Sequence, residues 1–184
     1  MLDHHDLASS WGSEGLVYIP LEKYRRFSKF DASLLSPGGA VPAELPSVFT
    51  TRTDGPAKSF SLIEIKVGKE DASHLVTLGA APHDNGLLFC LDMADGGVAL
   101  LSLDDPAIER VNSSLLTFVE FLTHLKNFSD ANTDRMDGAR RITHLRRKLT
   151  KIDAHAFSDP ESWWSIAFTQ LEKRYSGPNH QNGQ

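Results

Sequence analysis

The middle of the chain carries the hydrophobic pattern that is typical of β-strands. Within residues 60–67, apolar and charged positions alternate with the two-residue period of a half-buried strand. Residues 74–78 predict a second strand, which Gly79 closes. Residues 87–91 are apolar at every position and predict a central strand that is covered on both faces. A sheet is therefore expected in this region.

A glycine-rich turn follows the central strand. Asp95, Gly96 and Gly97 separate it from a second apolar run at residues 98–103. Glycine reaches positive φ without a steric penalty, so a pair of glycines between two apolar runs predicts a β-hairpin.

The last third of the chain has the period of helices. Apolar residues from 115 to 125 fall on one stripe, and Ser114 and its neighbours supply oxygens that can cap a helix start. Residues 135–152 predict a second helix with an apolar face opposite a basic one. We expect a third helix that begins near residue 159, with Asp159 as its cap and Pro160 at its first position.

The first sixty residues are harder to interpret. Residues 15–19 suggest a short strand and residues 21–30 a short helix. Prolines and glycines then punctuate residues 33–56, which predicts an irregular segment and the most mobile part of the molecule.

Strands followed by helices indicate an α+β fold, with a mainly antiparallel sheet and helices packed on it. A length of 184 residues favours a single domain, which we place at residues 1–175. Residues 176–184 contain no apolar anchor and are expected to form a flexible C-terminal tail.

The composition indicates an ordinary globular chain from a reducing compartment. Hydrophobic residues make up 40% and charged residues 23%, and Cys90 has no second cysteine to pair with. No signal peptide or membrane-spanning run is visible, so a cytoplasmic location without membrane contact is expected.

The sequence offers no motif for catalysis or for a cofactor. Phosphate-binding and dinucleotide-binding glycine loops, a serine-nucleophile elbow and a His-Glu-x-x-His zinc motif are all absent. Cys90 lies in an apolar strand, where a thiol is structural rather than reactive. The histidines are too scattered to predict a metal site. We expect no enzyme activity, no cofactor and no metal.

Charge suggests two candidate binding surfaces. The net charge of −5 argues against a dedicated nucleic-acid binder. Carboxylates around the predicted hairpin could form an acidic surface for a basic partner, and they are Asp92, Asp95, Asp104, Asp105 and Glu109. A second possible face, on the helix predicted at residues 135–152, consists of Arg140, Arg147, Lys148 and Lys151. An ordinary solvated surface is the alternative for both sets.

Several short motifs occur together in an order that resembles a known family. They are residues 43–49, 74–79, 88–92, 96–98, 110–115, 118–122 and 158–163. In this order they resemble the SUKH superfamily of bacterial immunity proteins, most closely its fourth subgroup. The similarity covers residues 45–175. Glu44 departs from the glycine expected there, and the basic run at residues 140–151 belongs to a variable part of the family.

The resemblance implies a non-catalytic protein that binds and neutralises a cognate toxin, often a nuclease or a nucleic-acid deaminase. Because such toxins have basic clefts, the acidic residues around the hairpin are the predicted partner-binding site. Reversing Asp92 and Asp95 is expected to slow binding without lowering the melting temperature, whereas reversing Arg147 and Lys148 should do little. The alternative is a non-catalytic regulatory module that binds a different protein on the same fold.

Overall fold

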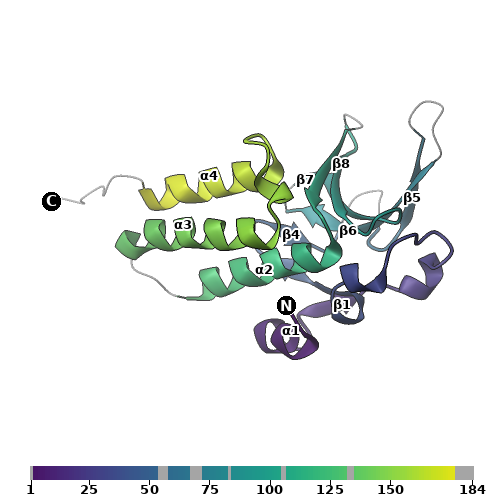
Figure 1. Cartoon of the computed structure of the whole chain (residues 1–184), viewed down its shortest axis with the longest axis horizontal. Coiled ribbons are helices and arrows are strands. Elements are labelled where there is room, and N and C mark those ends of the chain that lie inside the picture. The colour runs from purple at the N-terminus through teal and green to yellow at the C-terminus, as the bar shows by residue number, and fades with distance from the viewer. Residues whose placement is uncertain are drawn as a thin grey trace.

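The computed structural model describes residues 2–53, 58–66, 72–82, 84–104, 107–131 and 135–176. Figure 1 shows strands gathered at one end of the molecule and three long helices, running side by side, at the other. This arrangement confirms the α+β class that the sequence predicts.

The larger of two sheets is antiparallel throughout. Along one path through its described residues, the strands are β3 (Glu44–Leu45), β4 (Phe49–Thr50), β6 (Ser73–Ala81), β7 (Asp84–Asp92), β8 (Val98–Ser102) and β9 (Ile108–Asn112). A further strand, β5 (Leu62–Ile65), pairs with the first half of β6. The predicted hairpin is therefore β7 and β8, joined by the glycine turn.

Strand β6 does not end at Gly79, as the sequence suggested, but continues to Ala81. A Cβ atom at residue 79 would lie 2.2 Å from the carbonyl oxygen of Thr50. The register with β7 also shifts between Thr77 and Gly79. The glycine thus marks a close approach of β4 inside the sheet rather than a strand end.

The N-terminal third contains more structure than its punctuation predicts. It begins with α1 (His4–Trp11), which Asp3 caps, and continues with β1 (Leu16–Tyr18) and 3₁₀ turns at Leu21–Tyr24, Ala32–Leu34 and Pro37–Gly39.

The prediction of an irregular segment at residues 33–56 is wrong for much of its described part. Strand β2 (Ala40–Pro42) pairs with β1. Val41 and Phe49 are completely buried. The strands here are two or three residues long, which is too short to show a periodic pattern in the sequence.

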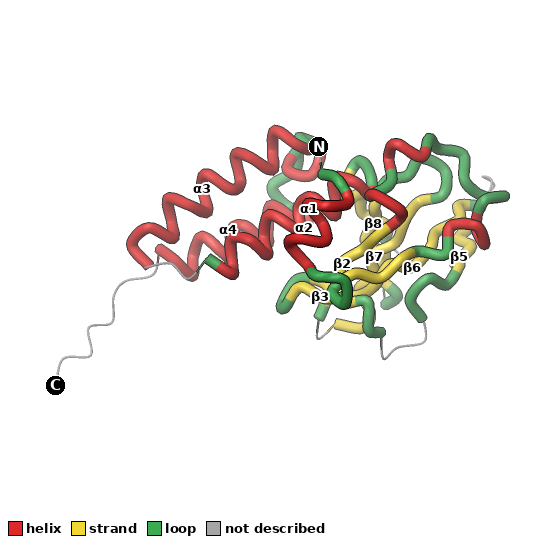
Figure 2. Tube along the Cα trace, turned by 90° about the horizontal axis from the view of Figure 1, so that it is seen from below, coloured by secondary structure: helices red, strands yellow, loops and turns green. Residues whose placement is uncertain are grey.

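Three long helices form a layer beside the sheet, as Figure 2 shows. Helix α2 (Leu115–Asp130) begins with a capping box between Ser114 and Thr117, and α3 (Arg135–Ile152) has the predicted bounds. Helix α4 (Trp163–Ser176) starts later than expected, after a 3₁₀ turn at His155–Phe157.

Asp159 does not cap α4. Its carboxylate accepts a hydrogen bond from the Glu161 N–H at 2.8 Å and closes a local turn. The hydroxyl of Ser162 instead accepts from the Ser165 N–H at 3.4 Å, in the position of the helix cap. Asp and Ser both cap helices, so the pattern could not distinguish between them.

Aromatic side chains join the sheet to α2. Phe49, Phe89 and Phe118 are fully buried, and their ring centroids lie 5.4 to 5.6 Å apart. They belong to the main core, which also takes in the predicted stripe of α2. Leu88 and Cys90 point to the opposite face of the sheet and form a smaller cluster there.

A buried carboxylate connects the end of α3 to the start of α2. Asp153 is 5% exposed and accepts hydrogen bonds from the Ser113 N–H, the Ser113 hydroxyl, the Asn112 amide and the Thr117 hydroxyl at 2.7 to 3.1 Å. The amide oxygen of Asn112 in turn accepts from the indole N–H of Trp164 at 2.9 Å. One polar network therefore fixes three helices and β9.

None of the described helices has the length and hydropathy needed to cross a membrane. The tail expected at residues 176–184 lies outside the described residues, except that Ser176 is the last residue of α4.

Candidate functional site

Two of the predicted acidic residues stabilise the turn between β7 and β8. Asp92 accepts a hydrogen bond from the Ala94 N–H at 2.8 Å, and Asp95 accepts one from the Gly97 N–H at 2.9 Å. A Cβ atom at residue 97 would lie 1.5 Å from the guanidinium of Arg110, so glycine there leaves room for that group.

Arg110 on β9 forms ion pairs with both carboxylates, which leaves the cluster one negative charge in excess. Its two terminal nitrogens bond the two oxygens of Asp95 at 2.6 and 2.8 Å, and one of them lies 3.4 Å from Asp92. Burial alone would raise the pKa of Asp95, but the hydrogen bonds from Arg110 and Gly97 hold the pKa below its ordinary value. The pair thus has an internal cation as its partner.

The remaining acidic residues lie elsewhere. Glu109 accepts a hydrogen bond from the Trp163 N–H at 2.6 Å, at the N-terminus of α4 where a negative charge is favourable. Asp104 follows β8 at the end opposite the Asp95 turn, and no ion pair in the described part of the chain reaches it. Asp105 lies outside the described residues. The structure does not bring the described carboxylates together in one patch.

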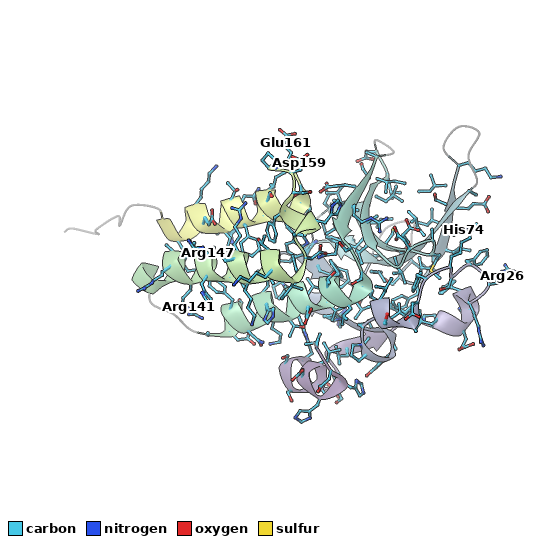
Figure 3. The ribbon with its side chains drawn as sticks, in the orientation of Figure 1. Arg26, His74, Arg141, Arg147, Asp159 and Glu161 are labelled. Atoms are coloured by element: carbon cyan, nitrogen blue, oxygen red, sulfur yellow. The ribbon has the colours of Figure 1, made fainter. Side chains whose placement is uncertain are left out.

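The basic residues of α3, by contrast, lie together. Arg140, Arg147, Lys148 and Lys151 are exposed, and Figure 3 shows Arg147 and Arg141 on this helix, far from Arg26 and His74 at the sheet end. Among the described residues, the ion pair made by α3 is between Arg146 and Glu172, at 3.5 Å.

A groove of about 500 Å³ borders this basic face, between α2 and α3. Its lining consists of His124, Asn127, Phe128, Arg140, Arg141, His144, Leu145 and Lys148. Arg141 lies over the Phe128 ring, 5.2 Å from its centroid. Burial and the nearby charge of Lys148 lower the pKa of His124, so that imidazole is neutral at pH 7.

A second groove, of about 590 Å³, lies between the β3–β4 turn and helices α2 and α4. Leu45, Val48, Leu125 and Leu171 contribute apolar surface to its lining, and Gln170 and Arg174 contribute polar surface. Phe128 lines both grooves and separates one from the other.

The single cysteine is poorly placed to act as a nucleophile. Cys90 is fully buried, and burial raises the pKa of its thiol to about 12. Such a thiol is protonated at pH 7 and is a poor nucleophile. Within the described ranges, no three metal-ligating side chains lie close enough to hold an ion.

The comparison with protein families decides the family of the chain. The family model of the SUKH-4 immunity proteins matches residues 2–170. The chain belongs to the SUKH-4 immunity protein family. No curated protein and no solved structure matches it significantly.

Several of the sequence motifs have structural roles in this SUKH-4 protein. The motif at residues 110–115 contains Arg110, which binds Asp92 and Asp95 of the turn, and Asn112 and Ser113, which bind Asp153. The motif at residues 158–163 ends at Trp163, where α4 begins. These residues are structural. Family membership supports an immunity role, in which the partner is a cognate toxin.

Sequence reasoning missed two features of the candidate surfaces. Arg110 was not recognised as the partner of the acidic turn. In the sheet, Cys90 of β7 pairs with Ala99 of β8, and Ala99 pairs with Arg110 of β9. The groove beside α3 depends on Phe128 and His124 of another helix, so no pattern within α3 could reveal it.

Proposed function

We propose that this SUKH-4 protein neutralises a cognate toxin that acts on nucleic acid, as a nuclease or a nucleic-acid deaminase, by binding it without catalysis. The observation that carries this proposal is the family match over residues 2–170. The buried thiol of Cys90 and its raised pKa agree with a role that needs no nucleophile.

Because a toxin that acts on nucleic acid must hold phosphates, its substrate channel is positively charged. A net charge of −5 on the immunity protein would favour encounter with such a toxin and keep the protein away from nucleic acid itself. We propose the cytoplasm as the compartment in which the two meet.

The test is neutralisation of a toxin domain, which we expect to be encoded beside the gene for this protein. We expect bacteria that express that toxin domain to survive only when this protein is co-expressed, and nucleic acid in their lysates to stay intact. The purified pair should co-elute in gel filtration. Survival without co-elution, or cell death despite equal expression, would contradict neutralisation by binding.

The chemistry of the toxin is tested in the same cells. Without the protein, a nuclease leaves fragmented DNA or RNA, and a deaminase leaves base changes in intact strands. A toxin that kills without either lesion would contradict the nucleic-acid part of the proposal and leave the binding role in place.

A regulatory protein-binding module is the second candidate, because the groove between the β3–β4 turn and α4 offers both apolar and polar surface to a host protein. It predicts a retained host protein in cells that lack any toxin gene.

A further inference from the structure

The acidic and basic side chains of the two candidate surfaces differ in whether they have partners within the protein. Asp92 and Asp95 share Arg110, and Glu109 binds the start of α4, so these three carboxylates have internal partners. On α3, no described carboxylate forms an ion pair with Arg140, Arg147 or any of their basic neighbours except Arg146. Basic side chains without an ion pair in the described part of the chain therefore gather on α3.

The basic residues of α3 form a stripe rather than a ring. At 100° per residue, Arg140, Arg147, Lys148 and Lys151 fall within an arc of about 100° and extend over about 16 Å. Like charges three or four residues apart destabilise an isolated helix by about 0.2–0.5 kcal/mol per pair. An anionic partner would relieve this repulsion, whereas solvent alone only screens it.

The groove beside the stripe adds an apolar contact to the charge. Phe128 and Leu145 contribute apolar surface, while Arg141 and Lys148 lie at its margin. Cations around an apolar depression suit a protein surface that presents carboxylates around an apolar side chain. A phosphate backbone would use the charge but leave the apolar surface unfilled.

We propose that the stripe on α3 and the groove between α2 and α3 are the surface on which the cognate toxin docks, through an acidic patch of the toxin. This inference rests on the proposed function and specifies its interface. Because the substrate channel of a toxin that acts on nucleic acid is positive, the acidic patch lies outside that channel. With this interface, Arg147 and Lys148 contribute to toxin binding, contrary to the expectation from sequence that they contribute little.

The experiment compares variants of the full chain with equal changes in net charge. The test variant is Arg147→Glu with Lys148→Glu, and the control is Lys23→Glu with Arg25→Glu, at exposed positions on the Leu21–Tyr24 turn and immediately after it. Binding to the toxin domain encoded beside the gene is measured by stopped-flow at several salt concentrations. Circular dichroism checks that both variants fold.

We expect the test variant to associate about tenfold to a hundredfold more slowly than the control at low salt, with a weaker salt dependence. Equal association rates for the two variants would overturn the inference and leave neutralisation intact. Slower association of an Asp104→Lys variant, with no effect of the α3 change, would place the interface on the acidic side instead.

A nucleic-acid arm separates the two kinds of anionic partner. A single-stranded oligonucleotide should not be retained by the wild-type protein at physiological salt. Retention that the α3 variant abolishes, with unchanged toxin binding, would assign the stripe to nucleic acid and overturn the inference. Failure of the wild-type protein to bind the toxin at all would refute the proposed function, and the inference with it.

Discussion

At the scale of single residues, the buried carboxylate of Asp153 joins several elements through hydrogen bonds. Four hydrogen bonds from β9, its following loop and α2 end on one carboxylate at the end of α3. Burial would raise its pKa, but these hydrogen bonds outweigh burial and lower the pKa below the ordinary value. The folded protein therefore holds this group ionised.

Asp153→Ala should lower the free energy of unfolding by about 2–4 kcal/mol at pH 7, because it leaves buried donors without an acceptor. Since the folded pKa is lowered, the stabilisation is present above the unfolded pKa of about 4 and is lost as the pH falls through the folded pKa. Urea unfolding at pH 7 and at pH 3 measures both effects.

The control for this prediction is Asp130→Asn, at an exposed side chain that pairs with Lys126. It should cost less than about 1 kcal/mol at pH 7. Equal losses in the free energy of unfolding for Asp153→Ala and the control would show that the buried network stabilises the fold no more than an exposed ion pair does.

At the scale of elements, the turn between β7 and β8 is more than an exposed acidic loop. Its two carboxylates hold the turn through backbone N–H groups and tie it to β9 through Arg110. The sequence indicated the hairpin and its glycines correctly. It could not show that Arg110, on a strand two places from β7, binds the same carboxylates.

Reversing both residues, Asp92→Lys with Asp95→Lys, should lower the melting temperature by about 3–6 °C, contrary to the expectation from sequence. Two lysines would stand beside Arg110 and the turn would lose two acceptors, a loss of about 1–2 kcal/mol in a chain of this size. Differential scanning calorimetry measures the shift. Asp104→Lys, a single charge reversal away from the turn, is the control and should change the melting temperature by less than about 1 °C. An equally small shift in the double variant would show that the turn does not need its carboxylates.

At the scale of the whole molecule, one core joins the N-terminal segment, the sheet and the helices. Leu7 of α1, Phe49 of β4 and Phe168 of α4 belong to the same cluster of buried residues. Phe118 lies at its centre, in contact with two other aromatic rings.

Phe118→Ala should therefore lower the free energy of unfolding by about 3–5 kcal/mol, which is the usual cost of truncating a buried Phe. Far-ultraviolet circular dichroism and tryptophan fluorescence should report the same, earlier transition. Ile166→Ala is the control, at a side chain that is 46% exposed, and should cost less than about 1 kcal/mol. A loss below about 1 kcal/mol for Phe118→Ala would place Phe118 outside the core.

The parts of the fold that sequence predicted are those with long regular patterns. Helix α3 has the predicted bounds, and α2 buries the predicted stripe together with Phe121. The short strands at residues 40–50 were not predicted, because their burial depends on partners elsewhere in the chain, such as β1 and β6. The charge of the candidate surfaces was not predicted for the same reason, since it depends on which ion pairs form in the folded protein.

The placement of the tryptophans has a practical consequence for spectroscopy. Trp11 donates a hydrogen bond to Thr123 of α2, Trp163 packs edge-on against Phe89, and Trp164 is buried beside Phe121. These are the three tryptophans of the chain, and each contacts α2 or the sheet face under it. Intrinsic tryptophan fluorescence therefore reports on the interface between the helices and the sheet. It does not report fraying of β5 at the far edge of the sheet.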